Sequence, residues 1–188
     1  AMELVELEID GAWLARSPIH KDERGIFREW FKSEDVKAAT GCDFAIKQAN
    51  ISLSSAGTLR GIHYSIAPRG QAKWITCVTG SIKDVVVDIR PNSTTFGKWI
   101  DVEITAELGN AIFISEGLGH GFLALEDETA VAYLVSTPFS SKDEYAINPL
   151  DEAIGIDWGA DLASIKISEK DQMAPTLSMQ LGNGKLPL

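Results

Sequence analysis

The sequence predicts an all-β fold, a jelly-roll β-barrel formed by a single domain that spans residues 1–188. Three observations support this prediction. Short segments of alternating apolar and polar residues follow one another between residues 46 and 135, these segments are rich in β-branched residues, and turn sequences separate them. Many short strands at regular spacing are typical of a β-sandwich or barrel. A chain of 188 residues is long enough to bury one sizeable core.

Each expected strand alternates in polarity and is bounded by residues that favour turns. The expected strands cover residues 46–53, 59–64, 73–78, 81–89, 99–104, 111–114 and 130–134. The turns between them are rich in Gly, Pro, Asn or Ser and fall at residues 55–57, 67–70, 79–80, 90–93 and 107–110.

One short helix is expected, at residues 33–40. Ser33 is suited to cap its N-terminus, acidic Glu34 and Asp35 suit the first turn, and Gly41 ends it. Beyond Trp158 the periodicity is lost, which predicts an irregular C-terminal tail of loops and short helical turns.

Composition and charge exclude several classes of protein. The 17 basic and 27 acidic residues give a net charge of −10, which disfavours nucleic acid and anionic membrane as partners. The chain has no apolar run of about 18 residues and no charged-then-apolar leader, so we expect no membrane span. Cys42 and Cys77 are too few for a disulfide framework. They are expected to be buried or partly buried thiols in a reducing cytoplasm.

The segment Leu-Arg-Gly-Ile-His-Tyr at residues 59–64 carries the strongest chemical signal. It combines the imidazole of His63 with the permanent charge of Arg60, and Lys73 adds an ammonium on what is expected to be a neighbouring strand. A base between two cations suits the deprotonation of an anionic carbon acid. The alternative is that His63 is a core histidine that hydrogen-bonds to the backbone.

Other polar residues could face the mouth of the barrel. Gln48 and Asn50 are two residues apart, so their amides point the same way from a strand; the alternative is a solvent-facing edge. The glycine-rich corner at 115–122 contains His120, which is either a turn residue or a residue that faces the ligand.

Three other kinds of chemistry have little support. His20, His63 and His120 lack the close spacing of a metal site, so no metal is expected. No serine lies in a nucleophile elbow, and Cys77 lies in an apolar run. No glycine-rich phosphate loop precedes a helix, which disfavours nucleotide-dependent redox or phosphoryl chemistry.

Taken together, the motifs resemble those of the dTDP-4-dehydrorhamnose 3,5-epimerase family of cupin-fold nucleotide deoxysugar epimerases. The similarity covers residues 11–176, nearly the whole chain. The segments that carry it are 22–27, 48–50, 59–64, 71–73, 84–90, 95–99, 116–122, 132–134 and 168–171.

The resemblance implies a role for each catalytic candidate. His63 would be the base, and Asp171 would orient it and raise its basicity. Tyr133, which by itself is more typical of a half-buried strand aromatic, would donate a proton on the opposite face of the sugar. Lys73 would stabilise the enolate oxygen at C4. The reaction would need no cofactor.

The resemblance also implies a dTDP-linked 4-keto-6-deoxyhexose substrate and a homodimer with exchanged strands, in which Arg24 and its neighbours act across the interface. The implied substrate-binding residues are Arg24, Phe27, Glu29, Gln48, Asn50, Arg60, His120, Phe139, Glu144 and Lys170.

One position departs from the family's commoner pattern. Phe139 stands six residues after Tyr133, where a second tyrosine usually stacks on thymine. The expected activity is epimerisation at C3 and C5, and the alternative is epimerisation at C3 alone. Two further classes stay open: a 3,4-ketoisomerase, which would use paired histidines, and a non-catalytic nucleotide-sugar-binding cupin.

Overall fold

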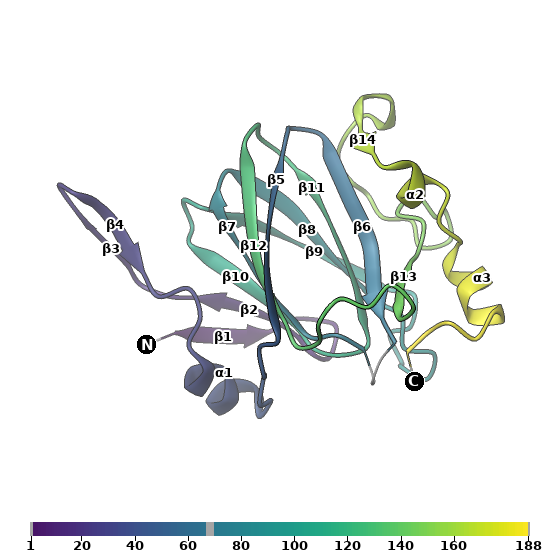
Figure 1. Cartoon of the computed structure of the whole chain (residues 1–188), viewed down its shortest axis with the longest axis horizontal. Helices are drawn as coiled ribbons and strands as arrows, with labels where there is room; N and C mark the ends of the chain where they lie inside the picture. Colours follow the sequence, from purple (N-terminus) through teal and green to yellow (C-terminus); the bar gives the residue numbers. More distant parts are fainter. Residues whose placement is uncertain (1, 67–69, 188) are drawn as a thin grey trace.

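The computed structural model describes residues 2–66 and 70–187. Over these residues the chain forms two large sheets, mostly of antiparallel strands, that face each other across a shared core (Figure 1). This arrangement confirms the predicted all-β jelly roll. No helix in the described parts of the chain has the length and apolar character needed to cross a membrane.

The first sheet has six strands and begins with the N-terminal pair. Its order is β1 (Glu3–Glu6), β2 (Ala12–Arg16), β10 (Asn110–Ile114), β7 (Lys73–Thr79), β12 (Thr129–Val135) and β5 (Gln48–Ser54). The second sheet has the order β13 (Glu144–Ala146), β6 (Thr58–Ser65), β11 (Leu118–Ala124), β8 (Ser81–Asp88) and β9 (Trp99–Thr105). A short strand, β14 (Lys166–Ile167), pairs in parallel with β6.

All the strands predicted from the alternating pattern are present, with ends that differ from the prediction by at most two residues. The expected turn at residues 67–70 lies outside the described residues except for Gly70. The sequence did not predict β1 and β2, nor the hairpin of β3 (Ile19–Asp22) and β4 (Gly25–Arg28), which projects from the barrel (Figure 1). Their segments of four or five residues are too short to show a clear period.

The helix α1 (Ser33–Thr40) occupies the predicted residues, but its cap differs from the prediction. Ser33 is already helical, and Lys32 is the N-cap residue with no side-chain hydrogen bond to the helix. The helix ends at Gly41, as predicted. Gly41 has φ +73°, and its N–H donates a hydrogen bond to the carbonyl of Lys37 at 2.8 Å.

The core has three parts. The first lies between the sheets and includes Ile75 from β7 and Val86 from β8. The second lies on the outside of the second sheet, where the tail covers residues such as Val85. The third lies on the outside of the first sheet, where Trp74 packs beneath the segment that contains α1. Both sheets are therefore covered over much of their outer faces.

The tail contains the short elements that the sequence predicted beyond Trp158. They are the 3₁₀ turn η1 (Leu162–Ser164) and the helices α2 (Glu169–Gln172) and α3 (Leu177–Gly182), which lie beside β6 and β13 (Figure 1). The two cysteines are free; Cys77 is buried and Cys42 is partly buried, as predicted.

Candidate active site

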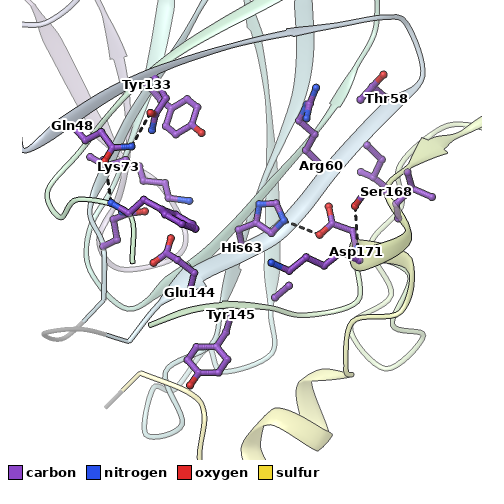
Figure 2. A pocket seen from close by; sticks show the side chains of 18 of the residues that line it. Gln48, Thr58, Arg60, His63, Lys73, Tyr133, Glu144, Tyr145, Ser168 and Asp171 are labelled. Atoms are coloured by element: carbon purple, nitrogen blue, oxygen red, sulfur yellow. Dashed lines mark hydrogen bonds and ion pairs between the residues drawn. The ribbon is translucent and has the colours of Figure 1, made fainter. Parts of the chain in front are cut away.

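A cavity of about 550 Å³ lies between the two sheets, on the side of the barrel formed by β5 and β6. Figure 2 shows that the first sheet contributes Gln48, Lys73 and Tyr133 to its wall, while the second sheet contributes Arg60 and His63. Asp171 and Ser168 from the tail close the side nearest β6. The cavity therefore brings together residues that are more than 100 positions apart in the sequence.

A bulge in β6 turns Arg60 and His63 into the same cavity although they are three residues apart. On β11 their partners are Phe122 and His120, which are only two apart, so β6 holds one extra residue at this point. Gly61 lies in the bulge with φ +127°, and a Cβ there would lie 2.6 Å from the Cα of Gly121. Only glycine fits this backbone and this close approach.

His63 is held by Asp171. Nε2 of His63 lies 2.8 Å from Oδ1 of Asp171, and the backbone N–H of Gly61 donates to Oδ2 at 3.2 Å. Asp171 is the third residue of α2, and Ser168 caps this helical turn because its hydroxyl accepts from the N–H of Asp171 at 3.1 Å. An Nε2–H that donates to Asp171 leaves the lone pair of Nδ1 for a ligand.

The electrostatic environment keeps Asp171 ionised. Burial raises the pKa of its carboxyl, but the hydrogen bonds from His63 and Gly61 outweigh this effect and leave the pKa below its ordinary value. A charged carboxylate behind an imidazole stabilises the imidazolium that forms when the ring takes a proton.

Lys73 reaches the cavity from the first residue of β7. The residue is only 8% exposed, and no ion pair or hydrogen bond of its ammonium occurs within the described residues. Burial lowers the pKa of Lys73, while the nearby carboxylates of Glu144 and Asp84 raise it. A buried ammonium without a partner is available to an oxygen of the ligand that gains negative charge.

Tyr133 faces the cavity from β12, on the wall opposite His63 (Figure 2). Its cross-strand partner is Asn50. Burial raises the pKa of the Tyr133 hydroxyl, and the charge of Arg60 and a hydrogen bond with Asn50 oppose the rise. The phenol is therefore protonated at neutral pH and able to donate.

Gln48 and Asn50 both line the cavity, so the alternative of a solvent-facing edge is wrong. Nε2 of Gln48 donates to Oδ1 of Asn50 at 2.9 Å, and Oε1 of Gln48 accepts from the backbone N–H of Phe139 at 3.0 Å. The Phe139 residue lines the cavity and is 64% exposed. Glu144 and Lys170 also line the wall.

His120 lies deeper, on β11, in a smaller hollow of about 150 Å³ that it shares with His63, Lys73 and Tyr133. It is a strand residue rather than a turn residue. Gly119 and Gly121 on either side of it make room for the side chain of Ile62. Its Nε2 lies 2.6 Å from Oδ1 of Asp84.

Three predicted binding residues lie away from this cavity. Arg24 and Phe27 belong to the projecting hairpin, and Glu29 follows directly after it (Figure 1). The Arg24 guanidinium forms an exposed ion pair with Asp22, and Phe27 is 64% exposed. Within one chain, therefore, the structure does not bring these residues to the site.

Asp84, whose carboxylate lies behind His120, was not predicted as a site residue. The available signal was an acidic residue at an inward-facing position of β8, between Ile82 and Val86. Within residues 2–66 and 70–187, no group of three or more His, Cys, Asp or Glu side chains is arranged to hold a metal ion.

An imidazole backed by a carboxylate, a protonated phenol on the opposite wall and a buried ammonium can together move protons on a carbon next to a carbonyl group. The fold and the site thus define an acid–base isomerase built on a cupin-type barrel. The chain belongs to the dTDP-4-dehydrorhamnose 3,5-epimerase family, whose model matches residues 6–179.

Individual relatives are similar over almost the whole chain. A dTDP-4-dehydro-6-deoxyglucose 3-epimerase of Streptomyces bikiniensis is 44% identical over 96% of this chain and 92% of its own length. A dTDP-4-dehydrorhamnose 3,5-epimerase of Mycobacterium tuberculosis is 42% identical over 99% of this chain and 93% of its own. The structure of a 3′-monoepimerase from Streptomyces bikiniensis in complex with dTDP-quinovose superposes with a TM-score of 0.90 at 44% identity, over 96% of this chain and 91% of that one.

Proposed function

We propose that the protein epimerises dTDP-4-keto-6-deoxy-D-glucose at C3 and C5 to give dTDP-4-keto-L-rhamnose. The observation that carries this proposal is the placement of His63 and Tyr133 on opposite walls of one cavity, with Lys73 between the sheets. Inversion of a carbon centre needs a base on one face and an acid on the other.

In the proposed mechanism His63 removes the proton from C3 through Nδ1, and the imidazolium is stabilised by Asp171. The electron pair of the broken C3–H bond forms a C3=C4 double bond, and the π pair of the C4 carbonyl moves to its oxygen, which gains negative charge next to the ammonium of Lys73. Tyr133 then gives its hydroxyl proton to the opposite face of C3. The same steps follow at C5 after the two side chains have exchanged their protons with solvent.

The diphosphate is proposed to bind Arg60 and Lys170, which line the same cavity. In a chain with a net charge of −10, these local cations make the site attractive to an anion. Gln48, Asn50, His120, Phe139 and Glu144 supply the further contacts to the sugar and the base.

The active form is proposed to be a homodimer in which the hairpin of one chain completes the site of the other. Two features support this. Arg24 and Phe27 are exposed on the hairpin, and the outer face of β5 exposes Ile51 and Leu53 by 75% and 66%. A contiguous exposed apolar surface marks an interaction site. The proposed location is the cytoplasm, where free Cys42 and Cys77 stay reduced.

Proton NMR of dTDP-4-keto-6-deoxy-D-glucose incubated with the protein in deuterated water tests the activity. We expect deuterium at both C3 and C5, together with inversion of both centres. Deuterium at C3 alone would replace the proposal with the 3-epimerase activity, which the Streptomyces bikiniensis relative makes a specific alternative. No exchange at either carbon would contradict both and favour a protein that only binds the nucleotide sugar.

A further inference from the structure

A second histidine–carboxylate pair lies beside the first, and its histidine lines the smaller hollow. His63 and His120 are direct cross-strand partners on β6 and β11. Each bonds a carboxylate through Nε2: His63 bonds Asp171 at 2.8 Å, and His120 bonds Asp84 at 2.6 Å. The two pairs differ in their surroundings, because the side chain of His63 is 49% exposed and that of His120 is 10% exposed.

The carboxylate of Asp84 is unusually placed. It is 0% exposed, faces the space between the sheets, and its Oδ2 atom has no hydrogen-bond partner among the described residues. Burial raises the pKa of this carboxyl, while its contact with His120 and the charge of Lys73 oppose the rise. Burying an ionised carboxylate is costly unless positive charge compensates it.

The compensating charge comes from the opposite sheet. Lys73 on β7 is buried and shares the inner hollow with His120. The ammonium of Lys73 and the carboxylate of Asp84 attract each other, yet their N and O atoms form no ion pair within 4.0 Å. Attraction across a buried space is strong even at this separation, because few water molecules screen it.

We propose that Asp84 is a positioning residue that holds two cavity groups in their working states. It fixes the proton of His120 on Nε2, so that Nδ1 accepts a hydrogen bond from the ligand. It also keeps Lys73 charged, so that an ammonium faces the oxygen that gains negative charge. The second role rests on the proposed function, whereas the charge coupling itself does not.

Two carboxylates oppose the effect of burial on the pKa of Lys73, and that of Glu144 acts more strongly than that of Asp84. Glu144 on β13 is the other acidic group that acts on Lys73, but it lies at the partly exposed rim. The remaining groups that line the inner hollow are Arg60, His63, His120 and Tyr133, and none of them carries negative charge at neutral pH. Asp84 is therefore the fully buried one of the two anions that act on Lys73.

The first test is the pH profile of turnover for Asp84→Asn, which preserves the shape and removes the charge. Activity needs protonated Lys73, so turnover declines as pH rises through the pKa of Lys73. We expect this decline to begin at least about one pH unit lower in the variant. A loss that is uniform over the whole pH range would overturn the proposal. Asp101→Asn, which removes an exposed carboxylate paired with Lys83, is the matched control and leaves the profile unchanged.

The second test needs no activity and applies even if Asp84→Asn fails to fold. The free energy of unfolding is measured for Asp84→Asn, Lys73→Met and the double variant. Each single change leaves one buried charge uncompensated, so the double variant should be more stable than the less stable single variant. Purely additive losses, or a double variant that also fails to fold, would overturn the charge coupling. If the wild-type protein is inactive but the charges of Asp84 and Lys73 are coupled, the proposed function is contradicted and the charge coupling stands.

A ¹⁵N NMR spectrum of the histidine side chains tests the remaining part of the proposal. His120 should carry its proton on Nε2 in the wild-type protein, and this preference should weaken in Asp84→Asn, because an amide can donate as well as accept. An Nδ1–H tautomer in the wild-type protein would contradict it.

Discussion

His63 and Asp171 are 108 positions apart in the sequence, and their side chains meet at 2.8 Å. The contact depends on two local structures: the bulge at Gly61, which turns His63 into the cavity, and the Ser168 cap, which begins the helical turn of Asp171. The C-terminal tail therefore supplies part of the wall of the cavity. The first prediction follows from this contact.

Asp171→Asn should lower turnover by about 10²- to 10⁴-fold while binding changes little, because the neutral amide neither fixes the ring nor stabilises the imidazolium. Steady-state kinetics on the nucleotide sugar measure kcat and KM separately. The exposed carboxylate of Asp161 offers a control, since it lies in the same tail and caps only the 3₁₀ turn η1. Equal losses for Asp161→Asn and Asp171→Asn would contradict the assignment.

The same contact predicts how stability depends on pH. The folded-state pKa of Asp171 lies below its ordinary value of 3.8, so ionised Asp171 stabilises the fold above that value. This stabilisation is lost as pH falls through the folded pKa. Urea unfolding of wild type and Asp171→Asn should therefore show a constant difference in the free energy of unfolding near neutral pH and a smaller one below pH 3.8. A difference that grows in acid would be incompatible with the lowered pKa.

Tyr133→Phe should separate exchange from inversion. His63 still removes a proton and can return deuterium to the same face, but no hydroxyl remains on the opposite wall. We expect product formation to fall by about 10²- to 10⁴-fold, with exchange at C3 retained. Proton NMR in deuterated water follows both events in one sample. If both deuterium exchange and inversion are lost, the base step is assigned to Tyr133 instead.

Gly61→Ala should destabilise the fold more than Gly25→Ala. Both glycines have large positive φ angles, +127° and +135°, so both substitutions strain the backbone. A Cβ at Gly61 also meets the backbone of Gly121, whereas a Cβ at Gly25 would have no atom of the described residues within 4 Å. We expect a cost of about 1–3 kcal/mol for Gly25→Ala and at least about 1 kcal/mol more for Gly61→Ala, measured by denaturant unfolding. Equal costs would show that the close approach of β6 to β11 is not tight.

Phe139→Ala should raise KM by about 5- to 100-fold with a small effect on kcat, because the exposed ring is expected to stack on the nucleotide base. Phe139→Tyr keeps the stacking surface and is the matched variant, so its KM should stay near the wild-type value. Steady-state kinetics with the dTDP-sugar measure KM and kcat for the two variants. A large rise in KM for both variants would indicate that Phe139 shapes the loop rather than binding the base.

Mixed dimers test whether Arg24 acts on the partner's site. His63→Ala and Arg24→Ala are each expected to be impaired as homodimers. Random mixing makes half of the dimers hybrids, and each hybrid has one intact site if the hairpin is shared, so activity should recover to about one quarter of wild type. Activity no higher than the average of the two parent proteins would place Arg24 in the site of its own chain.

Much of the barrel could be predicted from the sequence because its strands are defined locally. Alternation of polarity depends on neighbouring residues, so β5 to β10 and β12 were predicted to within two residues. Motif resemblance identified the family and named His63, Lys73, Tyr133 and Asp171, which the structure gathers around one cavity. The four-residue strands of the hairpin are too short to carry the same periodic signal.

The sequence by itself determined the strands β5 to β10 and β12, the glycine of the bulge and the chemical types available for catalysis. Only the tertiary structure decided that Asp84 backs His120, which is 36 positions away, and that Lys73 is buried near Asp84, since the consecutive strands β7 and β8 belong to different sheets. Burial sets the electrostatic strength of such groups, and burial is a property of two packed sheets rather than of any one strand.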